Sequence, residues 1–222
     1  MKIKFFVMRI LFLSSLLLLL SVSGYSQSAI KVSFETQTKH SETSLKSVPE
    51  HIRIAALQQL NSLKKESVMT VQDNVVYYEV KPQEINKKQN GIINSSDKTS
   101  GVLFSKDLSL EGSYPSLKVL KNFKTNTIKT KIKDQVTTEK IAAIKWKLTD
   151  KKIKILGYTC YEATTTFKNK LLTVYATNDL KVSGSPSDLP FINGLVLSYK
   201  HGNSTTTAQK VELKQTLPVN FL

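Results

Sequence analysis

Cysteine is almost absent from this sequence, because Cys160 is the single cysteine among 222 residues. An intramolecular disulfide is therefore excluded, and stability has to come from apolar burial and backbone hydrogen bonds. Cys160 stands between Thr159 and Tyr161 in an alternating stretch, which predicts a small buried side chain within a strand. A thiol nucleophile is the alternative, and it would need a base brought near the sulfur by folding.

Glycine and histidine are also sparse, and their spacing excludes several kinds of site. No two of the eight glycines have the separation of G-x-G-x-x-G, of a Walker loop or of a G-x-S-x-G elbow. The three histidines, His40, His51 and His201, are scattered without the spacing of metal ligands. The sequence thus predicts no metal, no cofactor and no catalytic residue, and it favours a protein that is not an enzyme.

Arginine is scarce although the chain is basic. Lysine and arginine number 32 against 17 acidic residues, for a formal charge of +15, yet Arg9 and Arg53 are the only arginines. Nucleic-acid sites favour the planar arginine fork, so nucleic acid is not an expected partner. The lysines alternate with apolar residues at 144–148 and 152–155, which is typical of the solvated face of a strand. A weak attraction to anionic surfaces remains as an expectation.

Long apolar runs are missing, except for one near the N-terminus. Basic residues up to Arg9 precede the apolar run 10–20, and small residues follow up to Ser26. This pattern predicts a signal peptide at residues 1–26, cleaved to leave a single domain at 27–222. The run is shorter than the roughly 20 residues of a bilayer-spanning helix. We therefore expect an exported protein, periplasmic, secreted or peripheral to the outer membrane, with no transmembrane segment after cleavage.

One helix is predicted near the start of this domain. Ser47 and Glu50 have the spacing of a capping box, and Pro49 suits the first helical turn. Apolar residues then recur at helical spacing up to Leu63. The helix is expected over about residues 48–65, packed on a sheet.

The remainder of the chain has the two-residue period of β-strands, rich in β-branched and aromatic residues. Residues 81–100 are polar and predict a long mobile loop. The predicted fold class is α+β, mostly antiparallel β, with one curled meander sheet and one N-terminal helix packed on it. The expected strands are residues 30–34, 75–80, 101–104, 117–123, 127–133, 142–148, 152–156, 158–167, 171–177, 195–200 and 205–213.

Several segments between residues 144 and 200 form a pattern that runs through the later strands of this set. They are Trp146-x-Leu148, Ile155, Gly157-Tyr158-x-Cys160-x-x-Ala163, Val174-Tyr175-x-Thr177 and Gly194-Leu195-Val196-Leu197. The pattern resembles that of the GLPGLI family, exported and mostly uncharacterised proteins of Gram-negative bacteria. The naming segment departs from the family at Phe191, Ile192, Asn193 and Val196. The resemblance implies an envelope location and a mostly β fold, and it implies no catalytic residue.

The function expected from this resemblance is that of a non-enzymatic binding or assembly module of the cell envelope. Its partner would be an envelope protein or an apolar ligand. A periplasmic carrier of an apolar ligand or lipoprotein and a Cys160-dependent enzyme are the alternatives. The candidate residues for contact with a ligand or partner are Trp146, Tyr158, Cys160, Phe191, Asn193 and Gly194. Packing of the aromatic and cysteine side chains in the core is the competing explanation.

Overall fold

The computed structural model describes residues 29–46, 49–84, 113–114 and 116–216. The predicted signal peptide, the predicted strand 101–104, the capping residue Ser47 and residues 85–100 of the predicted loop lie outside them. Within the described part of that loop, the short strand β4 (Gln83–Glu84) pairs with β5 (Ser113–Tyr114).

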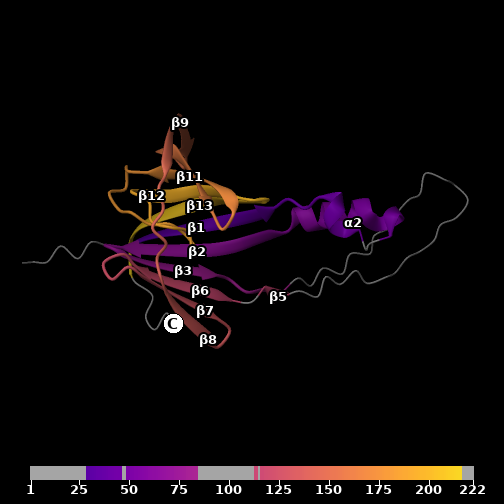
Figure 1. Ribbon diagram of the computed structural model, residues 1–222, viewed down its shortest axis with the longest axis horizontal. Helices are drawn as coiled ribbons and strands as arrows, with labels where there is room; N and C mark the ends of the chain where they lie inside the picture. Colours follow the sequence, from indigo (N-terminus) through magenta and orange to yellow (C-terminus); the bar gives the residue numbers. More distant parts are fainter. Residues whose placement is uncertain (1–28, 47–48, 85–112, 115, 217–222) are drawn as a thin grey trace, which may run out of the picture.

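Eleven strands of the described residues form one antiparallel sheet, in the order β8-β7-β6-β3-β2-β1-β13-β12-β11-β10-β9 (Figure 1). The N-terminal half consists of β1 (Ala29–Thr38), β2 (Lys64–Gln72), β3 (Val75–Val80), β6 (Leu117–Asn122), β7 (Thr127–Ile132) and β8 (Gln135–Lys140). The C-terminal half consists of β9 (Lys147–Ile155), β10 (Tyr158–Phe167), β11 (Lys170–Thr177), β12 (Leu195–His201) and β13 (Ser204–Gln215).

The first and last described strands in chain order, β1 and β13, join the two halves of the sheet. β1 pairs with β13 along most of its length, and Phe34 lies opposite Ala208 after a shift in register. The prediction of a single meander is therefore wrong, because the sheet consists of two runs of sequential hairpins that meet where β1 pairs with β13. A two-residue period shows which face a side chain takes but not which strand lies beside it.

The helix also differs from its prediction. After the 3₁₀ turn η1 (Glu42–Leu45), the helix α2 (Glu50–Ser62) extends beyond the ends of the strands (Figure 1). No described side chain of α2 is buried, and Ile54 is 65% exposed. Leu57 and Leu60 are only half-buried, so the described apolar side chains of α2 form no buried face against the sheet. The α+β prediction with a packed helix is wrong, and the described chain is nearly all-β.

No helix among the described residues has the length and apolarity that a bilayer crossing requires.

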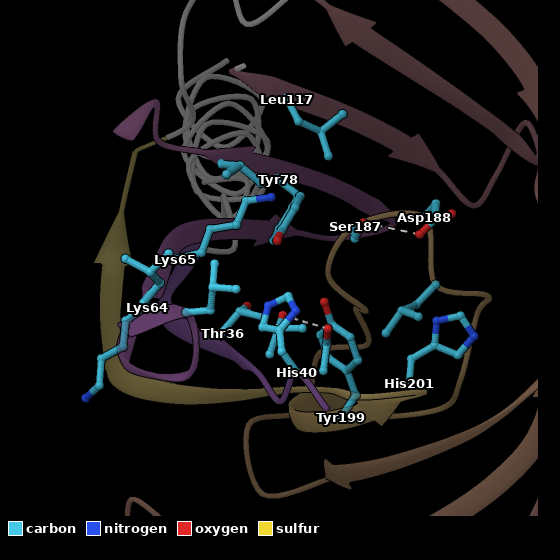
Figure 2. Close-up of a pocket in the computed structure, with 16 residues that line it drawn as sticks. Thr36, His40, Lys64, Lys65, Tyr78, Leu117, Ser187, Asp188, Tyr199 and His201 are labelled. Atoms are coloured by element: carbon cyan, nitrogen blue, oxygen red, sulfur yellow. Dashed lines mark hydrogen bonds between the residues drawn. The ribbon is translucent and has the colours of Figure 1, made fainter. Parts of the chain in front are cut away.

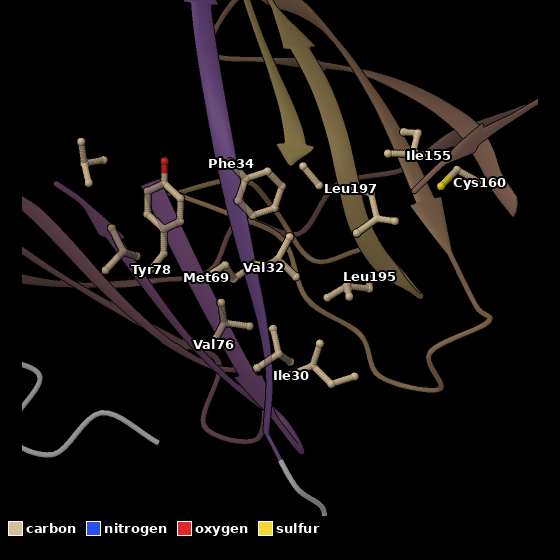
Figure 3. Close-up of a cluster of buried hydrophobic side chains, with 14 of the residues drawn as sticks. Ile30, Val32, Phe34, Met69, Val76, Tyr78, Ile155, Cys160, Leu195 and Leu197 are labelled. Atoms are coloured by element: carbon tan, nitrogen blue, oxygen red, sulfur yellow. The ribbon is translucent and has the colours of Figure 1, made fainter. Parts of the chain in front are cut away.

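Two apolar clusters form the core. The larger cluster collects alternate residues of the N-terminal half, such as Val32, Phe34 and Met69, together with Leu195 and Leu197 of β12. Figure 3 shows these side chains converging between β1, β2 and β12. The smaller cluster lies in the C-terminal half and contains Ala163, Phe167, Leu172, Val174, Ala176, Leu189, Ile192 and Val196. The segment between β11 and β12 contributes Leu189 and Ile192 and is thereby held on the sheet.

Candidate functional site

Lys121 of β6 is a fully buried lysine, with 0% of the residue exposed. Its neighbours at alternate positions, Leu117, Val119 and Phe123, pack with the larger cluster, so the strand alternation turns Lys121 inward as well. Burial lowers the pKa of the Lys121 ammonium to about 7, and the charge of Asp188 offsets this only in part. Burying a lysine ammonium group costs free energy unless its N–H groups donate hydrogen bonds.

The hydrogen-bond acceptors that the described residues offer to Lys121 come from one loop, residues 184–194. The Nζ atom donates to the Ser185 carbonyl oxygen, to Ser185 Oγ at 2.8 Å and to the Leu189 carbonyl oxygen at 3.0 Å. Three acceptors match the three N–H groups of an ammonium ion, whereas a neutral amine has two. Lys121 therefore fixes the 184–194 loop to the inner face of the sheet.

The two ends of this loop are also tied together. The Gly184 N–H donates to the Gly194 carbonyl at 3.1 Å, and the Val196 N–H donates to the Gly184 carbonyl at 2.9 Å. The Gly194 N–H donates to Ser183 Oγ at 2.9 Å. Ser187, Asp188 and Leu189 are thus presented from a loop that is closed at its base.

These three residues line a cavity of about 300 Å³, which we call the inner cavity. Its other walls come from the ends of β1, β2, β3, β12 and β13, from Leu60 at the end of α2 and from His40. Figure 2 shows Tyr78 and Tyr199 lining it from opposite sides, with Ser187 and Asp188 together on one flank. The remaining lining residues are Thr36, Thr38, Leu63, Lys64, Lys65, Val80, Leu117, His201 and Ser204.

Hydroxyl groups of threonine, serine and tyrosine are the most frequent polar groups in the lining of the inner cavity. Thr38 Oγ1 and Ser204 Oγ are 2.9 Å apart, which links β1 to the start of β13 at the wall of the cavity. Burial raises the pKa of Tyr78 and that of Tyr199, with the charge of Asp188 adding to both shifts. Both phenols therefore remain protonated, and each offers a hydroxyl that both donates and accepts.

Asp188 is the one carboxylate among the described residues that line the inner cavity. Burial alone would raise its pKa, but the hydrogen bond and the charge of Lys168 outweigh burial and lower the pKa below its ordinary value. Ser187 Oγ donates to Asp188 Oδ1 at 3.2 Å. The cavity thus presents an ionised acceptor beside phenols and apolar walls. This mixture suits a ligand that has several hydroxyls and an apolar ring face.

Four of the six residues predicted to contact a ligand meet at the 184–194 loop. The Trp146 indole N–H donates to the Phe191 carbonyl at 2.8 Å. Phe191 is 43% exposed as a residue, and its ring packs edge-on against Phe123 with 4.8 Å between centroids. The Asn193 carbonyl accepts from the Tyr161 hydroxyl. Trp146, Phe191, Asn193 and Gly194 thus support the loop, and none of them lines the inner cavity.

Of the other two predicted residues, Cys160 belongs to the larger core cluster, and Tyr158 is partly buried and packs against that cluster. Cys160 is fully buried and free of any disulfide. Its thiol lies 3.7 Å from the Tyr158 carbonyl, and burial raises the pKa of the Cys160 thiol to about 11. A thiolate is the reactive form of cysteine, so this environment suppresses its reactivity.

Cys160 should consequently not react with thiol reagents in the folded protein. With Ellman's reagent at about pH 8, we expect less than about 10% of one thiol per chain to react within minutes, since the thiol is both buried and protonated. Addition of urea beyond the unfolding transition should release the full equivalent. Complete reaction without urea would contradict the buried position of the sulfur.

Metal-ligand clusters are not found in the part of the chain that the structure describes: it contains no group of three or more histidine, cysteine or acidic residues placed to hold an ion. His201 is instead engaged through Nε2 with the Phe167 carbonyl at 2.9 Å. His40 is held by its backbone N–H, which donates to Asn61 Oδ1 at 2.6 Å.

Sequence reasoning missed the residues that build the inner cavity. The alternation Leu117, Val119, Lys121, Phe123 contained a usable signal, because it turns a lysine toward the core. Asp188 and Tyr199 carried no such signal, since their roles arise from the meeting of a loop with strands that are distant in sequence.

Comparison with known proteins finds one matching family model and similar solved structures. Residues 75–221 match the family model described as "N-glycanase peptide, N-terminal domain". Two solved structures of PNGF-II, in C2 and P21 space groups, align with TM-scores of 0.55 at 18% and 19% identity. Each alignment covers 86% of this chain but 28% or 29% of the PNGF-II chain, so the present chain spans less than a third of those proteins. No curated protein matches.

These matches overturn the predicted function. The prediction of a non-enzymatic binding or assembly module of the envelope, with an apolar-ligand carrier or a Cys160-dependent enzyme as alternatives, is wrong, because the chain matches the model of the N-glycanase peptide N-terminal domain. Solvated strands and a buried cysteine fit many all-β domains, and they carried no information about a glycan. The resemblance to the GLPGLI family stays a prediction, because the matches do not bear on it, and it no longer describes the function.

Proposed function

Because the chain belongs to the family of N-glycanase peptide N-terminal domains, we propose that it recognises N-linked glycans for N-glycanase-type processing of glycoproteins. The observation that carries the proposal is the family match over residues 75–221. That match includes the 184–194 loop and every strand from β3 to β13, and therefore most of the inner cavity.

The inner cavity has properties that suit part of a glycan. Its volume of about 300 Å³ lies at the lower end of the roughly 300–1,000 Å³ of ligand sites. The hydroxyls of Thr38, Tyr78 and Tyr199 pair with sugar hydroxyls in either direction, and the Asp188 carboxylate accepts from them. Leu60 and Leu63, both half-buried, offer apolar contact to a ring face.

The place of action that we propose is outside the cytoplasm. The basic start, the apolar run and the small residues up to Ser26 have the order of an export signal. Glycoproteins carrying N-linked glycans are largely extracellular, so an exported protein would meet them.

The experiment compares an N-glycopeptide with the same peptide after its glycan has been removed, by titration calorimetry. We expect measurable binding for the glycopeptide alone. Replacing Asp188 with asparagine should weaken binding about tenfold or more, because the variant removes a charge-assisted acceptor from the cavity. Asp150→Asn is the matched control, since Asp150 lies exposed on β9 and away from the cavity. Equal binding of the two peptides, or equal effects of the two variants, would refute the proposal.

A further inference from the structure

A second hollow adjoins the inner cavity, and we call it the outer cavity. Its volume is about 830 Å³, and it is formed around the β12–β13 turn with residues of β11. Thr38, His201 and Ser204 line both cavities, so these three residues form the boundary between them. Tyr199 and Lys200 are consecutive residues of β12 and point to opposite faces of the sheet, so a ligand longer than one sugar ring would pass around the end of β12, at His201 and Ser204, to reach from the inner cavity into the outer one.

The outer cavity is basic. Lys170 and Lys200 both line it together with His201, and no described lining residue is acidic. Among the ion pairs of the described residues none involves Lys170 or Lys200. The inner cavity, by contrast, contains the Asp188 carboxylate together with Lys64 and Lys65. The two cavities thus differ in that only the inner one has an acidic residue in its described lining.

The two lysines are placed by the backbone. Lys200 pairs in register with Thr173 of β11, so their side chains rise on one face, and Thr173 also lines the outer cavity. Lys170 lies over the turn, because a Cβ added at Gly202 would be 3.2 Å from Lys170 Cδ and 3.6 Å from Nζ. The strand pairing and the turn therefore bring both ammonium groups to the rim of one hollow.

We infer that the two cavities form one extended glycan site, in which the outer cavity takes an anionic sugar residue bearing a carboxylate or a sulfate group. This inference rests on the proposed function. Two ammonium groups without a protein counter-ion attract such a group, and the hydroxyls of Thr173 and Ser204 supply further donors. The contact is exposed and hence screened by salt. Neutral sugars nearer to the peptide would occupy the inner cavity.

The test uses three glycopeptides that differ only at the glycan termini: sialylated, sulfated and neutral. At about 0.05 M NaCl we expect either acidic glycopeptide to bind about five- to tenfold more tightly than the neutral one, and the difference should shrink at about 0.5 M NaCl. The sialylated and sulfated arms identify which anion the site prefers. Equal binding of all three by the wild type would overturn the inference while leaving the proposed glycan recognition intact.

Variants then show which lysines cause the tighter binding of acidic glycopeptides. The double variant Lys170→Ala with Lys200→Ala should lose the preference for acidic termini and keep its affinity for the neutral glycopeptide. The control pair Lys152→Ala with Lys154→Ala removes two exposed lysines from the edge strand β9 and should change nothing. A double variant that retains the preference would place the anion elsewhere and refute the inference.

Free sialyllactose separates this inference from the proposed function. If no glycopeptide binds better than the peptide without glycan, the proposed function fails. Shifts of the backbone amide signals of Lys170, Lys200 and Gly202 on addition of sialyllactose would still support an anionic-sugar site. The absence of such shifts would overturn it.

Discussion

Replacing Lys121 with methionine is expected to abolish a rise in stability with pH that the wild-type protein shows just above neutrality. Burial lowers the pKa of Lys121 from 10.5 to about 7 in the folded chain. Between these two values the unfolded chain binds one more proton than the folded chain, so the free energy of unfolding increases with pH. Below about pH 7 both states are protonated, and the cost of burying the charge is fully present.

The rise in the free energy of unfolding is best measured between about pH 7 and 8.5. Above it the Cys160 thiol, with a pKa that burial raises from 9.0 to about 11, begins to ionise in the unfolded chain first and acts in the opposite direction. Within this interval, one proton changes the free energy of unfolding by up to about 1.4 kcal/mol per pH unit. Urea unfolding at several pH values should show a rise of about 1 to 2 kcal/mol for the wild type and a flat profile for Lys121→Met.

The residues around Lys121 support the assignment of the pH dependence to Lys121 itself. Its neighbours across β3 and β7, Val76 and Ile128, carry no charge. Among the described residues the charge of Asp188 acts on Lys121, and Asp188 is itself paired with Lys168. Lys129→Met, which removes an exposed lysine from β7, should keep the wild-type slope. A wild-type slope in Lys121→Met would contradict the assignment, whatever the absolute stability of that variant.

The same substitution should affect the inner cavity. Methionine cannot donate to the Ser185 and Leu189 carbonyls, and these buried groups would lose a partner. The 184–194 loop should then be held less firmly, and Asp188 with it. Absolute stability does not separate these effects, because removing a buried charge and removing its hydrogen bonds oppose each other. The pH slope isolates the charge.

Most of the strands were predictable from alternation, whereas their partners were not. The predicted strand 158–167 coincides with β10, and 171–177 differs from β11 by one residue. The strand β8 was missed because all six of its residues are exposed and give no alternating signal. The expected break near Asp150 is absent, since β9 runs from Lys147 to Ile155 as an edge strand that tolerates polar residues on both faces.

The candidate site was less predictable than the fold because its parts come from separate segments. Tyr78, Asp188 and Tyr199 meet only after β1 pairs with β13 and the 184–194 loop folds over the inner face. The family pattern predicts that Phe191, Asn193 and Gly194 contact a ligand or partner. In the structure they support that loop instead.

Gly194→Ala is expected to be among the most destabilising single changes in this loop. Gly194 has φ +96°, a conformation that costs other residues roughly 1–2 kcal/mol. A Cβ atom there would be 2.6 Å from Asn178 Oδ1, 2.8 Å from the Thr177 carbonyl oxygen and 3.2 Å from the Tyr161 hydroxyl. The carbonyl belongs to the backbone of β11 and cannot move freely. Crowding of this kind adds about 1–3 kcal/mol, so we expect a total near 3 kcal/mol.

Gly157→Ala is the matched control for this expectation. Gly157 has φ +87°, similar to that of Gly194, but a Cβ atom at Gly157 would meet nothing within 4 Å. This variant should show the cost of the backbone conformation alone, about 1–2 kcal/mol in urea unfolding. Equal losses for the two variants would mean that β11 yields to the added methyl group. A larger loss at Gly194, accompanied by weaker glycopeptide binding, would show that the base of the 184–194 loop positions Asp188 in the cavity.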